Sequence, residues 1–291
     1  MSGQNEGQWG LHEARAWARA RLGEAGIDSV DADTRELLEW ACNASSQWEL
    51  PTALTQRQSE ALRSGVRERS LRIPLQHVTG RMFFRSLTLR SMPGVFVVRP
   101  ETEILAGFAI EEACRVVADR GEARVVDLCT GSGAIALAVA AEAPCTEVWA
   151  VENDPFALAC RNRDLTGCHD VHLERGDATE PITLDFLDGL VDIVVTNPPY
   201  VPANEMPTQP EASADPHCAL YGGSADGTQI PSKIIRRALT LLRPGGLLLM
   251  EHSPSQAAVL REHATRVGMV DVSTAPDMTG RLRFLRARAP Q

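Results

Sequence analysis

Apolar residues recur at helical spacing along residues 8–72, a pattern typical of helices that bury one face. The predicted helices lie at about residues 8–23, 33–43 and 55–70. Gly23 supports the first boundary, because glycine commonly follows the last residue of a helix. These segments contain no reactive constellation of side chains. We therefore predict a small helical domain over residues 1–74 whose role is substrate docking or packing.

The pattern changes over residues 75–98, where apolar and polar residues alternate as they do in half-buried strands. Gly80 and the pair Pro93-Gly94 are typical turn residues within this stretch. We therefore predict a β-hairpin over residues 75–98 that links two domains. Pro100 then suits the first turn of a helix, which we expect to continue to about residue 119.

Strand-like and helix-like segments alternate from residue 124 to the end of the chain. The predicted strands lie at about residues 124–129, 147–152, 171–176, 191–196, 247–252, 270–275 and 281–288. The predicted helices lie near residues 133–142, 155–165, 230–242 and 255–267. Such alternation predicts an α/β fold, with a mostly parallel, Rossmann-like sheet of seven strands covered by helices on both faces. We expect this domain to cover residues 99–291 and to bind its ligands at the carboxyl ends of the strands, with residues 201–229 as a substrate loop.

The composition of the chain narrows its location and partners. The formal net charge of −9 is unlike the basic character of proteins that hold long nucleic acids. No apolar run reaches the roughly 18–20 residues that cross a membrane, and the first residues lack the pattern of a signal peptide. The seven cysteines include no CxxC pair, which argues against a zinc site. We therefore expect a cytoplasmic monomer with reduced thiols, no metal, no membrane and no stable nucleic-acid partner.

A glycine-containing turn follows the first strand of the predicted sheet, in the sequence Asp127-Leu128-Cys129-Thr130-Gly131-Ser132-Gly133. Glycines allow the backbone to approach a ligand closely, although the same pattern occurs in many nucleotide-binding folds. The third glycine of a dinucleotide fingerprint is absent, which favours a ligand without a pyrophosphate. Glu152, at the end of the second strand, suits a ribose hydroxyl pair, and Asp177, after the third, could face an adenine amine. Taken alone, either acid could equally be an ordinary strand-end or turn residue.

The sequence Asn197-Pro198-Pro199-Tyr200 follows the fourth strand. Such a turn presents the side-chain oxygen of Asn197 and the carbonyl oxygen of Pro198 together, and neither proline offers a competing N–H. Two adjacent acceptors can hold both hydrogens of a planar NH2 group while Tyr200 packs beside it. An amide nitrogen is a poor nucleophile, so positioning would supply most of the acceleration. Placed at this point of the sheet, the motif predicts methyl transfer to a planar nitrogen.

These features resemble class I S-adenosylmethionine-dependent methyltransferases, and among them the release-factor glutamine methyltransferases of the HemK/PrmC type. The resemblance covers about residues 30–288. It is carried further by Pro74-Leu75-Gln76-His77-Val78-Thr79-Gly80, Arg99-Pro100-Glu101-Thr102-Glu103, Asp215-Pro216-His217-Cys218-Ala219-Leu220-Tyr221-Gly222-Gly223, Asp226-Gly227, Pro244-Gly245-Gly246 and Glu251-His252. It implies that S-adenosylmethionine donates a methyl group to the amide nitrogen of the glutamine in a Gly-Gly-Gln tripeptide. The implied protein partner is a class I peptide-chain release factor.

The resemblance also implies the residues of the site. Catalysis falls to Asn197, Pro198, Pro199 and Tyr200, which also bind the substrate together with Arg99 and Glu103. Cofactor binding falls to Asp127, Cys129, Thr130, Gly131, Ser132, Gly133, Glu152, Asn153, Asp177, Ala178 and Asn197. The chain departs from the family, which often has glycine at the position of Cys129, aspartate at that of Glu152 and a bulky residue at that of Ala178.

Three other functions are compatible with the same motifs. Enzymes that methylate adenine or guanine amines use a similar turn, but the acidic composition and the helical N-terminal segment argue against a nucleic-acid substrate. A paralogue acting on a small-molecule amide or amine, or on another protein, would show the same site residues. A module that binds the cofactor without catalysis would leave the intact Asn197-Pro198-Pro199-Tyr200 motif idle.

Overall fold

The computed structural model describes residues 9–154, 156–205 and 210–291. By its contacts the chain divides into two compact units. The first consists of Met1–Arg81 with Gln209–Ala214, and the second of Met82–Thr208 with Asp215–Gln291. The first unit is therefore built from two separate stretches of sequence, because a short segment of the predicted substrate loop belongs to it.

The first unit is helical, as the sequence predicts. Its helices are α1 (Leu11–Glu24), α2 (Val30–Cys42), α3 (Gln56–Ser70) and α4 (Leu75–Thr79), with β1 (Trp9–Gly10) paired to β2 (Ala53–Leu54) and short 3-10 turns at Gln47–Glu49 and Pro210–Ala214. Leu22, Leu37 and Leu62 lie fully buried at its centre, one from each long helix. Thr55 caps α3, because its hydroxyl accepts from the N–H of Gln58 and the Gln58 side chain accepts from the N–H of Thr55. The first predicted helical position, residue 8, lies outside the described residues.

The first unit also contains a buried ion pair between two helices and the 210–214 segment. Arg69 of α3 donates from Nε to Asp33 of α2 at 2.7 Å, and its Nη2 lies 2.9 Å from a carboxylate oxygen of Glu211. The Arg69 side chain is only 7% exposed. A buried guanidinium requires such partners, because an unpaired buried charge is strongly destabilising.

The predicted hairpin over residues 75–98 is wrong in its extent. Residues 75–79 form helix α4, and only β3 (Arg81–Phe84) and β4 (Leu87–Arg90) pair as strands. Leu75 and Val78 both enter the core of the first unit, and residues three apart lie on one side of a helix but on opposite sides of a strand. Burial of these two side chains therefore favours the helix over the strand.

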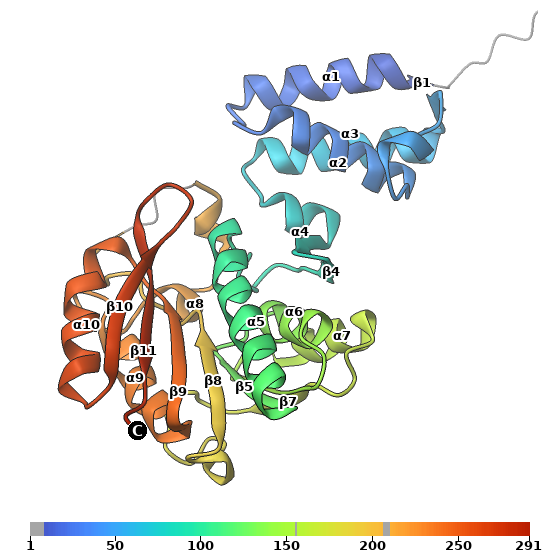
Figure 1. Ribbon diagram of the computed structural model, residues 1–291. Coiled ribbons are helices and arrows are strands. Elements are labelled where there is room, and N and C mark those ends of the chain that lie inside the picture. The colour runs from blue at the N-terminus through green and yellow to red at the C-terminus, as the bar shows by residue number, and fades with distance from the viewer. Residues whose placement is uncertain (1–8, 155, 206–209) are drawn as a thin grey trace, which may run out of the picture. The chain divides into compact units, whose positions relative to one another are not determined.

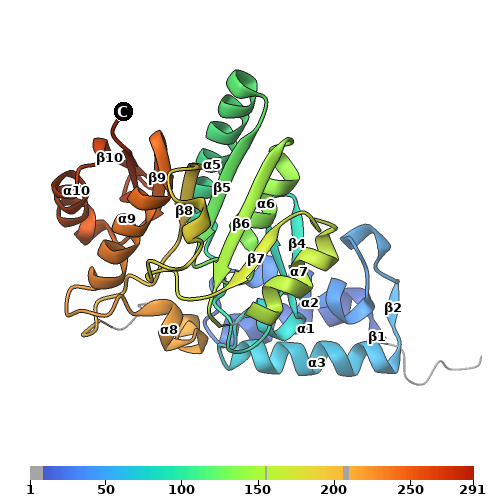
Figure 2. The ribbon, with the colours of Figure 1, turned by 90° about the horizontal axis from the view of Figure 1, so that it is seen from below.

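The second unit contains the predicted seven-stranded sheet. Its strands are β5 (Ala123–Leu128), β6 (Thr146–Glu152), β7 (His172–Arg175), β8 (Val191–Thr196), β9 (Leu242–Glu251), β10 (Val270–Pro276) and β11 (Leu282–Arg288), in the order β10-β11-β9-β8-β5-β6-β7. Only β11 runs antiparallel to its neighbours. Figure 2 shows β8, β5, β6 and β7 side by side. From β5 the chain builds outward through β6 and β7, then crosses to β8 on the other side of β5. This reversal marks the point where ligands bind to such sheets.

Helices cover both faces of this sheet (Figure 1). Helices α5 (Pro100–Arg120) and α6 (Ala134–Glu142) pack on one face, and α9 (Gln229–Leu241) and α10 (Ala257–Arg266) on the other. Val125 and Val126 are adjacent in β5 and fully buried, yet they belong to the two different clusters. The central strand is thus buried on both faces, as expected of a parallel sheet. The remaining helices are α7 (Phe156–Thr166) and the short α8 (His217–Leu220).

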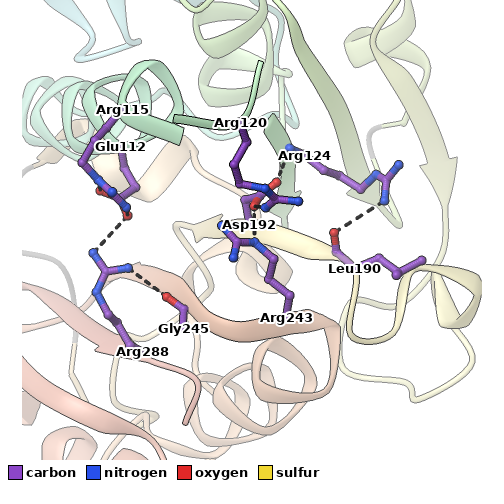
Figure 3. A network of polar contacts seen from close by, with 9 residues as sticks. All are labelled: Glu112, Arg115, Arg120, Arg124, Leu190, Asp192, Arg243, Gly245 and Arg288. Atoms are coloured by element: carbon purple, nitrogen blue, oxygen red, sulfur yellow. Dashed lines mark hydrogen bonds and ion pairs between the residues drawn. The ribbon is translucent and has the colours of Figure 1, made fainter. Parts of the chain in front are cut away.

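A polar network joins the amino ends of three strands (Figure 3). Asp192, near the start of β8, is only 5% exposed. Its Oδ1 accepts from Arg120 Nη1 at 2.5 Å and from Arg243 Nε, and its Oδ2 accepts from the N–H of Arg124 at 2.7 Å. One carboxylate therefore connects the end of α5 to β5, β8 and β9. It does so at the edge of the sheet opposite to the strand ends that carry the candidate site.

Candidate active site

The glycine turn follows β5 at the carboxyl edge of the sheet. Cys129, Gly131 and Gly133 all have positive φ, at 64°, 59° and 88°, so the backbone coils tightly between strand and helix. The N–H of Thr130 donates to the carbonyl of Val151 at 3.0 Å, which fixes the turn to β6. Among the described residues, no atom lies within 4 Å of the position that a Cβ of Gly131 would occupy. The turn thus leaves open space beside Gly131 for a ligand.

Asp127 shapes this turn from beneath. It is fully buried, and its Oδ2 accepts from Thr130 Oγ1 at 2.5 Å and from the N–H of Ala136 at 3.1 Å. Burial raises the pKa of Asp127 to about 7, against the opposing effect of these hydrogen bonds. Its Oδ1 and the hydroxyl of Ser132 have no hydrogen-bond partner within the part of the chain that the structure describes. Both atoms are buried beneath the turn, so they shape it from within and do not face the open space beside Gly131.

Glu152 ends β6 beside the same turn. One carboxylate oxygen accepts from the N–H of Gly131 at 2.6 Å, and the other accepts from the N–H groups of Asn153 and Asp154 at 2.9 and 3.0 Å. Burial raises the pKa of Glu152, and these three donors oppose that shift. The half-buried carboxylate is thereby held at the edge of the turn, where its remaining lone pairs can accept from hydroxyl groups.

The third strand contributes two predicted residues of different character. Asp177 is exposed, and its carboxylate accepts from the N–H of Thr179 at 2.8 Å in a turn. Ala178 is 5% exposed and packs in the core on the α9 side of the sheet. The small side chain at residue 178 is thus part of the core, which leaves Asp177 as the polar group at this strand end.

The Asn197-Pro198-Pro199-Tyr200 turn follows β8, next to β5 in the sheet. Thr196 fixes the two strand ends together, because its hydroxyl donates to the carbonyl of Leu128 at 2.5 Å. The side chain of Asn197 donates from Nδ2 to Thr102 Oγ1 at 3.3 Å, and the hydroxyl of Tyr200 donates to Glu251 at 3.1 Å. Burial is the main cause that raises the pKa of Tyr200, so the phenol stays protonated and remains a donor.

The backbone of this turn is tightly packed against residues 220–227. The N–H groups of Tyr200 and Val201 both donate to the carbonyl of Leu220, at 3.1 and 2.7 Å. The N–H of Gly222 donates in turn to the carbonyl of Val201 at 3.0 Å. A Cβ added to Gly227 would lie 2.2 Å from the carbonyl oxygen of Tyr200. Glycine is therefore required at this position by the close approach of two backbone segments.

Arg99 and Glu103, the predicted substrate residues on α5, are engaged within the second unit. Arg99 pairs with the buried Asp215, whose Oδ1 also accepts from the N–H of Val97 at 3.1 Å. Glu103 accepts from the N–H of Arg85 at 3.1 Å, in the turn between β3 and β4. The two side chains thus serve different parts of the unit, and Thr102 between them is the α5 residue that contacts Asn197.

Three residues of the site were not predicted from the sequence, namely Thr102, Glu251 and Gln256. The Gln256 side chain donates to the carbonyl of Tyr200 at 2.7 Å and to that of Asp226 at 2.8 Å, and so joins the two packed segments. Thr102 and Glu251 lie in local patterns that carry the family resemblance. Glu251 follows the apolar run Leu247–Met250, which is a signal for a buried carboxylate, whereas Thr102 stands between Glu101 and Glu103 and has no such signal.

The donor set fits an adenosyl ligand. Open space beside a glycine of positive φ and a half-buried carboxylate at the next strand end suit a ribose. Within the described ranges, no cluster of three or more metal-ligating side chains occurs. In those same ranges, no helix is long and apolar enough to cross a membrane.

Two family descriptions match the chain. Residues 13–80 match the PrmC N-terminal domain, and residues 87–210 match the methyltransferase small domain. The second match contains the glycine turn, Glu152, Asp177 and the Asn197-Pro198-Pro199-Tyr200 turn.

Curated relatives match along nearly the whole chain. A release factor glutamine methyltransferase of Bifidobacterium longum is 43% identical over 288 residues, which cover 93% of this chain and 96% of the relative. Proteins of the same name from Streptomyces coelicolor and Deinococcus radiodurans are 42% and 36% identical, over 94% and 96% of this chain and 96% and 98% of their own lengths.

Proposed function

The chain belongs to the family of release factor glutamine methyltransferases, and from this premise we propose that it methylates the side-chain amide nitrogen of a release-factor glutamine. The proposed acceptor is the glutamine of the Gly-Gly-Gln tripeptide in a class I peptide-chain release factor, and the proposed methyl donor is S-adenosylmethionine. The observation that carries this function is the Asn197-Pro198-Pro199-Tyr200 turn, held at the end of β8 directly beside the glycine turn of β5.

The cofactor half of the site is formed by the ends of β5, β6 and β7. S-adenosylmethionine supplies a methyl group on a positively charged sulfur, from which the methyl passes to a nucleophile. In this proposal Glu152 accepts from the ribose hydroxyls, Gly131 gives room for close approach, and Asp177 faces the adenine. The wider set is Asp127, Cys129, Thr130, Ser132, Gly133, Asn153, Ala178 and Asn197, of which Asp127 acts by shaping the turn.

The acceptor half of the site is the turn after β8. The amide nitrogen of glutamine is a weak nucleophile because its lone pair is delocalised. Asn197 Oδ1 and the carbonyl oxygen of Pro198 would accept its two hydrogens and hold the nitrogen in place as it loses planarity. Pro199 and Tyr200 would lie beside the substrate amide. The new N–C bond would form as the sulfur–methyl bond breaks, which leaves S-adenosylhomocysteine, and one amide proton would pass to solvent. Orientation, rather than a strong base, provides the acceleration.

Arg99 and Glu103 support the substrate side of this arrangement. Arg99 is partly exposed and packs over Phe96 while it pairs with Asp215, and we propose that its exposed part contacts the tripeptide backbone. Glu103 is bound to the hairpin turn, and its proposed contribution is to fix that turn. We further propose that the enzyme acts as a cytoplasmic monomer without membrane or stable nucleic-acid partners, which its net charge of −9 supports.

The test is incubation with labelled S-adenosylmethionine and a purified class I release factor, followed by peptide mass mapping. The expected product carries one added methyl group on the glutamine of Gly-Gly-Gln. The control substrate is the same release factor with Gly-Gly-Ala in place of that tripeptide, which should remain unlabelled. Equal labelling of the two release factors would refute the proposed acceptor. Labelling of neither, with the cofactor bound, would indicate a different amide or amine substrate.

A further inference from the structure

Glu251 is a buried carboxylate with no role in the function proposed above. It ends β9, is 1% exposed, and accepts from Thr102 Oγ1 at 2.8 Å and from the hydroxyl of Tyr200 at 3.1 Å. Burying a carboxylate costs free energy that hydrogen bonds only partly offset. Both of its partners contact or belong to the acceptor turn, so the position of Glu251 concerns that turn rather than the stability of the sheet alone.

The hydroxyl of Thr102 has a single hydrogen, and this determines the orientation of Asn197. Because that hydrogen is donated to Glu251, the hydroxyl oxygen can only accept from its other neighbour. Asn197 must therefore turn its Nδ2 toward Thr102, where it donates to Oγ1 at 3.3 Å. The Oδ1 of the same amide group then points away from Thr102. The hydrogen-bond network thus selects one of the two orientations that an asparagine side chain can adopt at nearly equal steric cost.

We propose that Thr102 and Glu251 are positioning residues that hold the amide of Asn197 with its oxygen available to the substrate. This inference rests on the proposed function, in which Asn197 Oδ1 accepts from the glutamine NH2 group. In the reversed orientation Nδ2 would face another NH2 group, and two donors cannot bond to one another. The Thr102–Glu251 pair therefore excludes the unproductive orientation before the substrate arrives.

The ionised form of Glu251 is the one that this arrangement requires, because a carboxylate only accepts whereas a carboxylic acid also donates. Burial raises the pKa of Glu251, and the hydrogen bonds from Thr102 and Tyr200 and the positive charge of Arg283 all oppose that shift. The charge of Glu101 adds to the effect of burial. Two donors and one cation thus surround the carboxylate and oppose the rise in its pKa, but burial is the larger effect and the pKa is raised overall. The arrangement therefore operates at pH values above that raised pKa, where the carboxylate only accepts.

The test compares three variants of the full-length enzyme. Thr102→Val keeps the shape of the side chain but removes the hydroxyl, and Thr102→Ser keeps the hydroxyl. Thr166→Val is the matched control, because the Thr166 hydroxyl donates to the carbonyl of Asn162 within α7, away from the acceptor turn. We expect Thr102→Val to lower kcat by roughly five- to thirtyfold, in keeping with one lost buried hydrogen bond, with the KM for release factor unchanged. Thr102→Ser should restore kcat, and Thr166→Val should match the unmutated enzyme.

A second measurement does not depend on the substrate. The side-chain amide signal of Asn197 in a proton–nitrogen correlation spectrum can be identified by its loss in Asn197→Asp. Thr102→Val should shift the hydrogen-bonded proton of that amide, and Thr102→Ser should return it. An unchanged Asn197 signal in a folded Thr102→Val enzyme, or an unchanged kcat, would overturn the inference. Should the unmutated enzyme fail to methylate the release factor, the proposed function fails, while the amide signal still decides whether Thr102 orients Asn197.

Discussion

Replacement of Gly227 by alanine should displace the acceptor turn and reduce methyl transfer. The added Cβ would lie 2.2 Å from the carbonyl oxygen of Tyr200 and 2.8 Å from the backbone nitrogen of Pro202. Ordinary carbon–oxygen contacts are about 3.5 Å, so the two segments must separate by roughly 1 Å. A displacement of about 1 Å at a positioning residue can lower a rate about a hundredfold. We therefore expect a loss of this order in kcat, measured by single-turnover methylation of a release factor.

Backbone strain must be separated from this collision. Gly227 has a φ of 71°, where a side chain costs about 1–2 kcal/mol, and overpacking adds about 1–3 kcal/mol. Gly189 has the same φ of 71° but no atom within 4 Å of its would-be Cβ among the described residues. Gly189→Ala should therefore lose only the strain energy in denaturant unfolding and keep full kcat. Equal activity of Gly227→Ala and Gly189→Ala, or equal destabilisation of the two variants, would show that the collision does not displace the turn.

Three further changes test other parts of the site. Asn197→Ala removes an acceptor that matters most as the substrate amide loses planarity. It should raise the activation free energy by about 2–4 kcal/mol in single-turnover kinetics and leave the affinity for S-adenosylhomocysteine unchanged. Equal losses in rate and affinity would contradict this role. Gly131→Val places a branched side chain at a φ of 59° in the space left for the ligand. Calorimetric titration of this variant with S-adenosylhomocysteine should therefore give no heat of binding. Unchanged affinity in a folded variant would refute the proposed cofactor site. Burial raises the pKa of Asp127 to about 7 from 3.8, so the unfolded chain loses this proton more readily than the folded protein, and the free energy of unfolding falls as the pH rises through that window. Asp127→Asn should therefore gain stability relative to the unmutated enzyme between pH 4 and pH 7. A pH-independent difference in thermal unfolding would exclude the effect.

The sheet and the strand-end motifs could be predicted because their signals are local. All seven strands of the large sheet lie close to the predicted segments, although β9 begins at Leu242, which pairs with Val191, rather than near residue 247. The glycine turn and the Asn197 turn each lie within a few residues of a strand end. Parallel order brings those ends to one edge, so the approximate site follows from the pattern alone.

The contacts that orient the site could not be predicted, because they join residues distant in sequence. Thr102 and Glu251 are 149 positions apart and come together only when α5 packs against the end of β9. The alternation of residues 75–98 predicts strands throughout, whereas burial of Leu75 and Val78 in the core of the first unit favours helix α4. Tertiary packing determines both the Thr102–Glu251 contact and the helical conformation of residues 75–79. The local sequence alone is compatible with other arrangements of these residues.

The division of the first unit between two stretches of sequence restricts how this protein can be synthesised and recombined. The segment that carries Glu211 leaves the ribosome only after most of the second unit has been synthesised. The ion pair between Arg69 and Glu211 in the helical unit can therefore form only at that late stage. An exchange of residues 1–81 between relatives would likewise separate Arg69 from its partner. An exchange that transfers the complete helical unit therefore has to include residues 209–214 as well as residues 1–81.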